Sequence, residues 1–431
     1  MDHLDGSDAP LQAEIVAVFG LGYVGRPLAM AMVDAGARVI GVDTDPSVLQ
    51  SLTPGAMNPG RPGEADRFRA TLIPEEARDA GVFMICVPTP NGGDGEPDMK
   101  PLLAVAESIG RILKVGDLVV CESTVYPGAM ENLLAQALEK WSGLTCGIEF
   151  DLAYSPERID PGVEAHAFGI TPKLVAGMTP RALDRAIALY RHIAPVVPVS
   201  SIGVAEAAKH LENAFRLVNI ALVNEFKAVL GPIGIDVWEV VAAAATKPFG
   251  FMQFSPGPGI GGHCIAIDPL QFAWAARQKG LSSPLIELAH RAARLEPRRV
   301  ADRIEAEFLR RHASLRGARL LVAGVSYKRD VADIRESPAL NLIDELLTRG
   351  ASVDYTDPHV PDLDVSGRAP GYPTHSIEPH RKVGRDYDAI IITTDHDRFD
   401  WATLLADATM VFDSRNAARG RAELGDRWVA V

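Results

Sequence analysis

Short apolar runs alternate with helical repeats through the first part of the chain. Residues 14–19, 38–42, 81–87 and 117–121 are apolar and rich in β-branched side chains, which is typical of buried strands. Leu28, Met32 and Val33 recur at helical spacing between the first two runs. This alternation of strands and helices predicts an α/β fold built on a parallel sheet.

A long helical repeat occupies the middle of the chain. Residues 204–230 contain neither Gly nor Pro and keep apolar positions at helical spacing, so they predict one continuous helix. Glu206, Lys209 and Asn213 share a face of this helix. Glu206 and Lys209 are either a solvated surface pair, or part of a set in which Lys209 and Asn213 orient a substrate oxygen.

The C-terminal part repeats the pattern of the first part. Residues 283–311 predict a helix, residues 318–324, 352–355, 388–392 and 410–413 predict strands, and residues 339–349 predict a helix among these strands. The two ends of the chain therefore carry similar α/β patterns on either side of a helical middle.

A glycine motif follows the first predicted strand and leads into a helix. In Gly20-Leu-Gly22-Tyr-Val-Gly25, the first glycine suits a tight turn, the second a close approach to a pyrophosphate, and the third close packing of helix on strand. Asp43 ends the second strand at the distance expected of an acid that binds a ribose 2′-hydroxyl, which favours NAD over NADP. The alternative for Asp43 is a turn or helix-capping acid.

Polar residues follow two further strands. Thr89 lies after residues 81–87, and Ser123 and Thr124 lie after residues 117–121. Ligands bind at the carboxyl ends of parallel strands, so these residues are candidates for contact with a cofactor or substrate, although Ser and Thr also cap helices. Glu157, in a proline turn further along, is either a surface charge or a base.

A glycine- and proline-rich segment, residues 255–268, carries Cys264 and Asp268. We expect it to form a loop that presents a thiol, because glycine and proline favour irregular backbone. The alternative is a tight turn with a buried cysteine. A long charged loop at residues 324–338 predicts a nucleotide or sugar-phosphate site that includes Lys328 and Arg335, or else a solvated surface loop.

Charge and composition narrow the partners. The 431-residue chain has a net charge of -13 and no basic patch, which argues against nucleic acid or an anionic membrane as a partner. Without an apolar run of membrane-spanning length or a signal-peptide pattern, the expected location is cytoplasmic. Four widely spaced cysteines form no metal-ligand pattern, so no metal is expected.

These motifs together resemble the UDP-glucose/UDP-N-acetylhexosamine 6-dehydrogenase family along nearly the whole chain. The resemblance rests on residues 20–25, Ser123-Thr124-Val, Ser155-Pro-Glu157, Lys209 with Asn213, Gly261-Gly-His-Cys264 with Asp268, and the segment from Tyr327-Lys328 to Arg335-Glu-Ser-Pro338. It implies two Rossmann-like doubly wound domains joined by a long central helix, and a homodimer. The implied domains are residues 11–203 for NAD, 204–312 for dimerisation and the cysteine, and 313–431 for the UDP-sugar.

The resemblance also implies the chemistry. Enzymes of this family oxidise the C6 hydroxyl of a nucleotide sugar to a carboxylate in two NAD-dependent steps through a cysteine-bound intermediate. Cys264 is the implied nucleophile, with Lys209, Asn213, Asp268, Glu157 and Thr124 as further catalytic residues. Implied cofactor contacts are Gly20, Gly22, Tyr23, Val24, Gly25, Asp43, Pro88, Thr89, Ser123, Thr124, Lys328 and Arg335; implied substrate contacts are Glu157, Arg158, Lys209, Asn213, Phe254, Gly259, Gly261, Tyr327 and Lys328.

Departures from the family pattern bear on the sugar. Arg158 and Pro161 stand where the UDP-glucose branch usually has phenylalanine and glutamate, and Ile267 stands where it has lysine. These residues favour the N-acetylhexosamine branch, with UDP-N-acetylglucosamine or UDP-N-acetylmannosamine as substrate. Residues 289–297 depart from the usual pattern of both branches. The alternatives are a UDP-glucose 6-dehydrogenase and a non-catalytic protein that binds NAD or a nucleotide sugar.

Overall fold

The chain folds into two compact units in the computed structural model. The structure describes residues 11, 14–52, 67–92, 95–158, 169–368, 370–378, 383–420 and 424–431. Unit 1 comprises Met1–Glu212 and Trp274–Gly280, and unit 2 comprises Asn213–Ala273 and Leu281–Val431.

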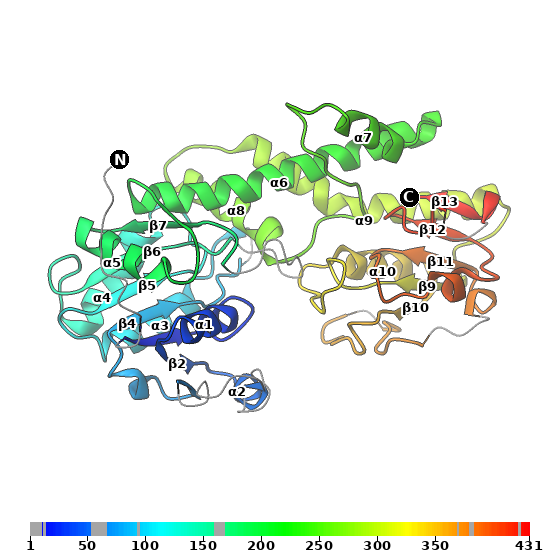
Figure 1. The fold of residues 1–431 in the computed structure, drawn as a ribbon. Helices are drawn as coiled ribbons and strands as arrows, with labels where there is room; N and C mark the ends of the chain where they lie inside the picture. The colour runs from blue at the N-terminus through cyan, green and yellow to red at the C-terminus, as the bar shows by residue number, and fades with distance from the viewer. Residues whose placement is uncertain are drawn as a thin grey trace. The chain divides into compact units, whose positions relative to one another are not determined.

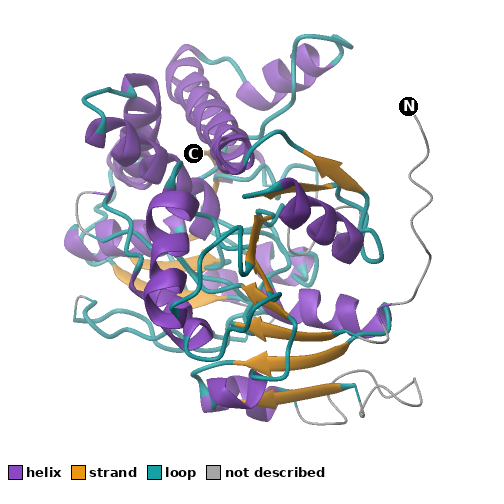
Figure 2. Ribbon diagram, turned by 90° about the vertical axis from the view of Figure 1, so that its left-hand side faces the viewer, coloured by secondary structure: helices purple, strands orange, loops and turns teal. Residues whose placement is uncertain are grey.

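Unit 1 is built on an eight-stranded sheet (Figures 1 and 2). The strands are β1 (Ile15–Phe19), β2 (Arg38–Val42), β3 (Phe68–Thr71), β4 (Val82–Ile85), β5 (Leu118–Cys121), β6 (Asp151–Tyr154), β7 (Lys173–Gly177) and β8 (Val196–Pro198). Their order is β3-β2-β1-β4-β5-β6-β7-β8, and every pair is parallel except β6 and β7. The reversal at β7 places its first residues at the carboxyl end of β6, where ligands bind in such sheets.

Helices cover both faces of this sheet (Figure 2). They are α1 (Gly25–Asp34), α2 (Pro46–Ser51), α3 (Lys100–Gly110), α4 (Ala135–Ser142) and α5 (Pro180–Tyr190). Along β1, Ala17 and Phe19 pack in the core with α3 and α4, whereas Val16 and Val18 pack in the core with α1 and α5. Both faces of β1 are thus buried, and this explains why its sequence is apolar throughout.

Four helices, two of them longer than 25 residues, form the middle of the chain (Figure 1). They are α6 (Ile202–Leu230), α7 (Val237–Ala245), α8 (His263–Gln278) and α9 (Pro284–Arg310). The predicted helices at residues 204–230 and 283–311 are confirmed as α6 and α9. Single helical turns lie at Pro74–Ala77, Gly231–Ile233, Val383–Arg385 and Gly425–Arg427, and a wider turn at Met130–Leu134 leads into α4.

Unit 2 contains a second, five-stranded parallel sheet. Its strands are β9 (Arg319–Ala323), β10 (Ser352–Thr356), β11 (Ala389–Ile392), β12 (Val411–Asp413) and β13 (Trp428–Ala430), in the order β10-β9-β11-β12-β13. Helices α10 (Pro338–Thr348) and α11 (Trp401–Leu405) accompany it. With a doubly wound sheet in each unit and the long α6 in the chain between the two sheets, the predicted fold class is confirmed.

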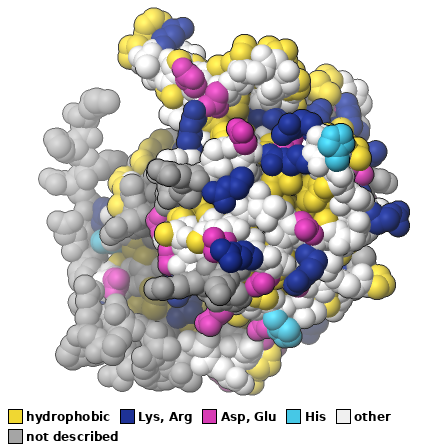
Figure 3. Space-filling view, turned by 90° about the vertical axis from the view of Figure 1, so that its right-hand side faces the viewer, with side chains coloured by type: hydrophobic (Ala, Val, Ile, Leu, Met, Phe, Trp, Pro, Cys, Tyr) yellow, Lys and Arg dark blue, Asp and Glu magenta, His cyan; other side chains and the backbone are white. Residues whose placement is uncertain are grey.

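The surface has no single sign of charge on the face that Figure 3 presents. Lys and Arg side chains are interspersed there with Asp, Glu and apolar side chains (Figure 3). Among the helices that the structure describes, none combines the length and the apolar character needed to cross a membrane.

Candidate active site

The glycine turn of unit 1 has the features that a dinucleotide needs. Gly20 has a φ of 91° and donates its N–H to Val42 O at 2.8 Å, while a Cβ on Gly25 would lie 1.7 Å from Gly20 O. These contacts explain the tight turn and the close packing of α1. A Cβ on Gly22 would instead meet no atom within 4 Å, so the backbone there borders open space that can accept a pyrophosphate.

Two further groups at this turn suit NAD. No side chain caps the start of α1 at Val24, so its first N–H groups have no capping side chain as partner and favour a phosphate. The half-buried carboxylate of Asp43 accepts hydrogen bonds from Leu21 N at 2.7 Å and Asp45 N at 3.0 Å. A carboxylate has about four acceptor sites, so capacity for a ribose hydroxyl remains. Asp43 therefore also stabilises a turn, which is one part of the alternative given for it. It is not the helix-capping acid, because Asp45 caps α2.

The polar loops after β4 and β5 are tied to each other. The Thr89 hydroxyl donates to Thr124 O at 2.6 Å, and the Ser123 hydroxyl donates to Val87 O at 2.7 Å. These hydroxyls fix the carboxyl edge of the sheet, which is a positioning role. Pro88, beside Thr89, is exposed. Contact of these residues with a cofactor stays a prediction.

Glu157 and Lys209 meet in the interior of unit 1. The Lys209 ammonium donates to the main-chain oxygen of Glu157. The Glu157 carboxylate accepts hydrogen bonds from Arg158 N at 2.6 Å and from Lys173 Nζ at 3.1 Å, and the residue is only 8% exposed. Glu157 is therefore not a surface charge. Sequence reasoning missed Lys173, because it begins a strand far from any motif.

Of the two alternatives for Glu206 and Lys209, the solvated surface pair is wrong, because both side chains are buried. Glu206 is buried and accepts hydrogen bonds from Gly128 N at 2.7 Å and Met130 N at 3.0 Å. Burial raises the pKa of the Glu206 carboxyl, and the two backbone donors oppose this shift. Glu206 thus holds the loop that follows Thr124.

Arg158 is engaged with neighbours in unit 1. Its guanidinium pairs with Glu212 at 2.7 Å and donates to Pro172 O at 2.8 Å. A guanidinium has five N–H donors, so these contacts do not use the full donor capacity of Arg158, and its contact with substrate stays a prediction. Pro161, another residue on which the sugar prediction rests, lies outside the described residues.

In unit 2, Cys264 lies in the first turn of α8, and its side chain is exposed. The loop predicted for residues 255–268 therefore ends at Gly262, because α8 begins at His263, and the alternative of a buried cysteine is wrong. The start of a helix carries a partial positive charge, which favours a thiolate over a thiol. This position suits a nucleophile better than a flexible loop does, because the helix fixes the direction of the side chain.

Asp268 lies one turn after Cys264 on α8. It is 1% exposed, and its Oδ2 accepts a hydrogen bond from Asn213 Nδ2 at 2.7 Å. Asn213 in turn lies one turn after Lys209 on α6. Three of the predicted catalytic residues, Cys264, Asp268 and Asn213, thus lie in unit 2 on the helices α8 and α6.

The glycine-rich segment before Cys264 packs against the charged loop after β9. Gly262 N donates to Arg335 O at 2.9 Å, and a Cβ on Gly262 would lie 2.7 Å from the Tyr327 ring. A Cβ on Gly261 would lie 2.6 Å from Tyr327 Cβ, and a Cβ on Gly259 would lie 2.8 Å from Pro338. The glycines are therefore required by close approach.

Other predicted ligand residues of unit 2 have intramolecular partners. Arg335 pairs with Asp333 at 2.6 Å, and Lys328 of the same loop is half-buried. The Phe254 ring packs against Phe215 at a centroid distance of 5.8 Å, within an apolar cluster. The structure leaves the roles of these residues in binding as predictions.

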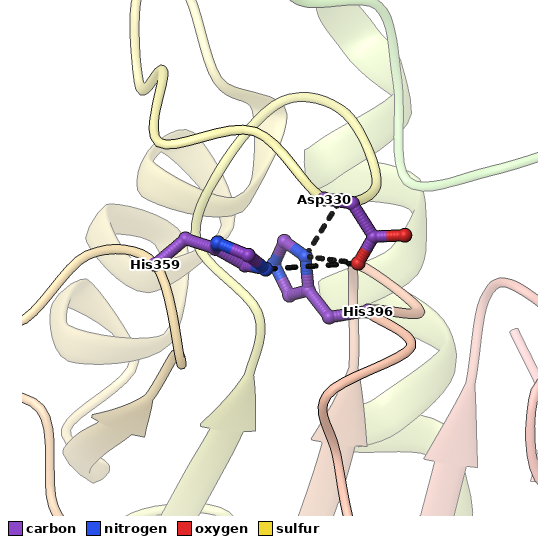
Figure 4. Close-up of side chains that lie close together, drawn as sticks. All are labelled: Asp330, His359 and His396. Carbon is purple, nitrogen blue, oxygen red and sulfur yellow. Dashed lines mark hydrogen bonds and ion pairs between the residues drawn. The ribbon is translucent and has the colours of Figure 1, made fainter. Parts of the chain in front are cut away.

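A cluster that the sequence did not suggest joins three loops of unit 2 (Figure 4). Asp330, His359 and His396 follow β9, β10 and β11, and His359 Nε2 lies 3.6 Å from Asp330 Oδ1. Asp330 N donates to His396 Nδ1 at 2.9 Å, so Nδ1 is an acceptor and the ring proton is on Nε2. His396 Nε2 lies 3.1 Å from Asp357 Oδ2 and donates to it. Because the Nδ1 lone pair is engaged, we interpret the cluster as a brace between loops.

Comparison with known proteins agrees with this architecture. The NAD-binding, central and UDP-binding domains of the UDP-glucose/GDP-mannose dehydrogenase family match residues 14–194, 203–294 and 321–420. The chain therefore belongs to this family, as its motifs predict. It is an NAD-dependent oxidoreductase that acts on a nucleotide sugar.

Individual relatives are similar along most of their length. The UDP-N-acetyl-D-glucosamine 6-dehydrogenase of Pseudomonas aeruginosa is 37% identical over 397 residues, which cover 89% of this chain and 91% of that protein. The structure of UDP-D-ManNAc dehydrogenase from Pyrococcus horikoshii has a TM-score of 0.85 and 29% identity, covering 97% of this chain and 99% of that one. A UDP-glucose dehydrogenase from Pyrobaculum islandicum follows with a TM-score of 0.82, 27% identity, and coverage of 96% and 98%.

Proposed function

We propose that this enzyme oxidises the C6 hydroxyl of a UDP-N-acetylhexosamine to the carboxylate, in two oxidations, through an intermediate bound to Cys264. The observation that carries the proposal is the exposed Cys264 thiol at the start of α8, one turn before the buried Asp268. An ordinary alcohol dehydrogenase needs no such nucleophile, whereas oxidation of an aldehyde to an acid benefits from a thiol adduct.

The first oxidation needs a base and a group that stabilises an alkoxide. Bound NAD supplies the acceptor for hydride in each oxidation. Asp268 accepts the hydroxyl proton through water, while the buried ammonium of Lys209 stabilises the developing negative charge. Asn213 fixes the Asp268 carboxylate through its 2.7 Å hydrogen bond. These roles follow the family resemblance.

The second oxidation and the hydrolysis need covalent chemistry. The Cys264 thiolate adds to the aldehyde carbon to form a thiohemiacetal, and loss of a second hydride leaves a thioester. Glu157 then removes a proton from water, whose oxygen adds to the thioester carbon; Thr124 helps to hold this water. The carbon–sulfur bond breaks, its electron pair leaves with sulfur, and the uronic acid is released.

The sugar assignment rests on residues beside Glu157 and Cys264. Arg158 and Ile267 replace residues of the UDP-glucose branch, and the Pseudomonas relative at 37% identity is named for an N-acetylated sugar. The fold does not separate the branches, because a UDP-glucose dehydrogenase also reaches a TM-score of 0.82. UDP-glucose therefore remains the second candidate substrate.

We also propose a homodimer formed along α6. Its exposed apolar side chains recur at helical spacing and form one stripe: Leu211 (72% exposed), Phe215 (44%), Leu222 (51%), Phe226 (49%) and Val229 (60%). Beside the second half of this stripe, an apolar groove runs between α6 and α7 and includes Phe251, Met252 and Phe254. A continuous apolar face of this kind is typical of a protein interface.

Light scattering tests the homodimer. The wild type should give twice the mass of the chain, and Phe226→Glu should yield monomers if the stripe is the interface.

A substrate panel tests the sugar assignment. We expect the purified full-length protein with NAD to show a kcat/KM at least about tenfold higher for UDP-N-acetylglucosamine or UDP-N-acetylmannosamine than for UDP-glucose, measured by NADH absorbance. A preference for UDP-glucose would overturn the assignment of the sugar. With the best substrate, Cys264→Ala should form no acid, while Cys146→Ala, a thiol in unit 1 outside the proposed chemistry, should retain full activity.

A further inference from the structure

Three charged side chains meet in the interior of unit 1. Lys173 Nζ lies 2.6 Å from Glu122 Oε2 and 3.1 Å from Glu157 Oε2. Exposure is 1% for Glu122, 4% for Lys173 and 8% for Glu157. Tyr190 at the end of α5 donates its hydroxyl hydrogen to the other oxygen of Glu122. Buried charges of this kind are rare unless each has a partner.

The sheet explains how these groups meet. Glu122 follows β5 and Glu157 follows β6, and these strands are parallel neighbours, so both carboxylates leave the same edge. In the antiparallel pair β6 and β7, Tyr154 lies opposite Ala176; continuing that register places residue 157 opposite residue 173. The one antiparallel pairing of this sheet is therefore what delivers an ammonium to the Glu157 carboxylate.

Charge makes this lysine essential to the arrangement. Burial alone would lower the pKa of Lys173, but Glu122 and Glu157 outweigh it and raise this pKa, so the lysine stays protonated. Burial raises the pKa of Glu122 to about 7, against the attraction of Lys173. Without the ammonium, two buried carboxylates would face each other, and at least one would hold a proton.

We propose that Lys173, anchored by Glu122 and Tyr190, is a positioning residue that keeps Glu157 ionised and aimed for hydrolysis of the thioester. The inference rests on the proposed function, in which Glu157 takes the proton of the attacking water. Lys173 touches neither substrate nor cofactor in this account. It acts through the one carboxylate oxygen of Glu157 that the backbone of Arg158 does not hold.

The test separates hydrolysis from oxidation. Lys173→Met should slow hydrolysis of the thioester, and both oxidations precede this step. We therefore expect a burst of about two NADH per active site, followed by turnover slowed by about 100-fold or more. Intact-mass measurement of the quenched enzyme should show the acyl adduct on Cys264. Lys173→Arg, which keeps the cation, should recover part of the rate, and Lys140→Met, an exposed lysine of the same unit, should match the wild type.

A double variant guards against misfolding. Glu122→Gln/Lys173→Met removes the facing pair of buried carboxylates, so it should fold, yet it should still accumulate the adduct because Glu157 lacks its anchor. Hydrolysis at the wild-type rate in either variant would overturn the role of Lys173. If the wild type forms no acid at all, the proposed function fails instead, so the two failures are distinguishable.

Discussion

The turns after β1 and β9 are built alike in the two units, and their differences show what each turn is for. Gly20 N donates to Val42 O, and Gly324 N donates to Thr356 O, both at 2.8 Å. Asp43 accepts from Leu21 N, and Asp357 accepts from Val325 N, both at 2.7 Å. Each unit therefore uses a glycine at positive φ and an acid after its second strand to close the same turn.

The acid is used differently in the two units. Asp43 is half-buried and keeps acceptor capacity. Asp357 is only 4% exposed and also accepts a hydrogen bond from His396 Nε2 at 3.1 Å. The first helix differs as well: α1 has no side-chain cap, but Ser337 caps α10. In unit 1, the acid keeps acceptor sites and the helix start keeps uncapped N–H groups, and both can bind a dinucleotide. In unit 2, the corresponding groups are hydrogen-bonded within the protein. A nucleotide sugar in unit 2 would have to be held by other groups.

The glycine at positive φ is common to the turns after β1 and β9, and replacing it should give the largest loss of stability. In Gly20→Ala and Gly324→Ala, a Cβ would lie 2.7 Å from Cys86 O or 2.5 Å from Thr394 Cβ, at positive φ. We expect each variant to lose about 3 kcal/mol of unfolding free energy or more, seen as a lower Tm by calorimetry. Gly22→Ala, with open space around its Cβ, should keep its Tm and bind NAD more weakly. Clearly unequal losses at Gly20 and Gly324 would show that the two turns do not contribute alike to stability.

Replacing the two acids separates binding from stability. Asp43→Asn should weaken NAD binding about tenfold, roughly 1.4 kcal/mol, with little change in Tm. Asp357→Asn should leave NAD affinity unchanged but cost about 3 kcal/mol of stability, because buried donors lose a charged acceptor. Calorimetric titration with NAD and thermal unfolding measure both effects. The account fails if Asp357→Asn weakens NAD binding more than Asp43→Asn does.

The pH dependence of stability gives a smaller effect. Burial favours the neutral form of Asp357, but hydrogen bonds from His396 and from the backbone N–H groups of Val325 and His359 outweigh it and lower its pKa. A lowered folded-state pKa stabilises the fold above the ordinary value of about 3.9, and that contribution is lost as the pH falls through the folded value. The stability difference between wild type and Asp357→Asn should therefore shrink below about pH 4 in urea titrations.

The helix caps should give the smallest effect. Ser337→Ala removes the cap of α10 and should cost about 1 kcal/mol. Val24→Ser adds a cap to α1; it should stabilise the protein without NAD slightly but weaken NAD binding, because the new cap competes with the pyrophosphate. Equal NAD affinity in Val24→Ser and wild type would show that the uncapped start of α1 is not used.

The sequence predicted the elements whose apolar pattern is long and regular. The run from residue 14 through Gly20 to α1 could be read because a buried parallel strand, a turn and a helix each leave a local signal. The long α6 was equally clear. The boundaries of the three domains and the cytoplasmic location stay predictions.

The sequence could not predict features that depend on distant pairing. Lys173 reaches Glu157 only through the antiparallel register of β6 and β7, which has no local signature. The two alternatives for Glu206 could not be separated because helical spacing says nothing about its partners Gly128 and Met130, which come from another part of the chain. Cys264 was placed in a loop because glycines and prolines precede it and Pro269 follows within α8.

The ratio of NADH formed to UDP-N-acetylhexosamine consumed decides between one and two oxidations at C6. We expect about two NADH per sugar for the wild type, with a uronic acid as product, and no acid from Cys264→Ala. A ratio of one, or acid formation that survives the loss of Cys264, would contradict the proposed function.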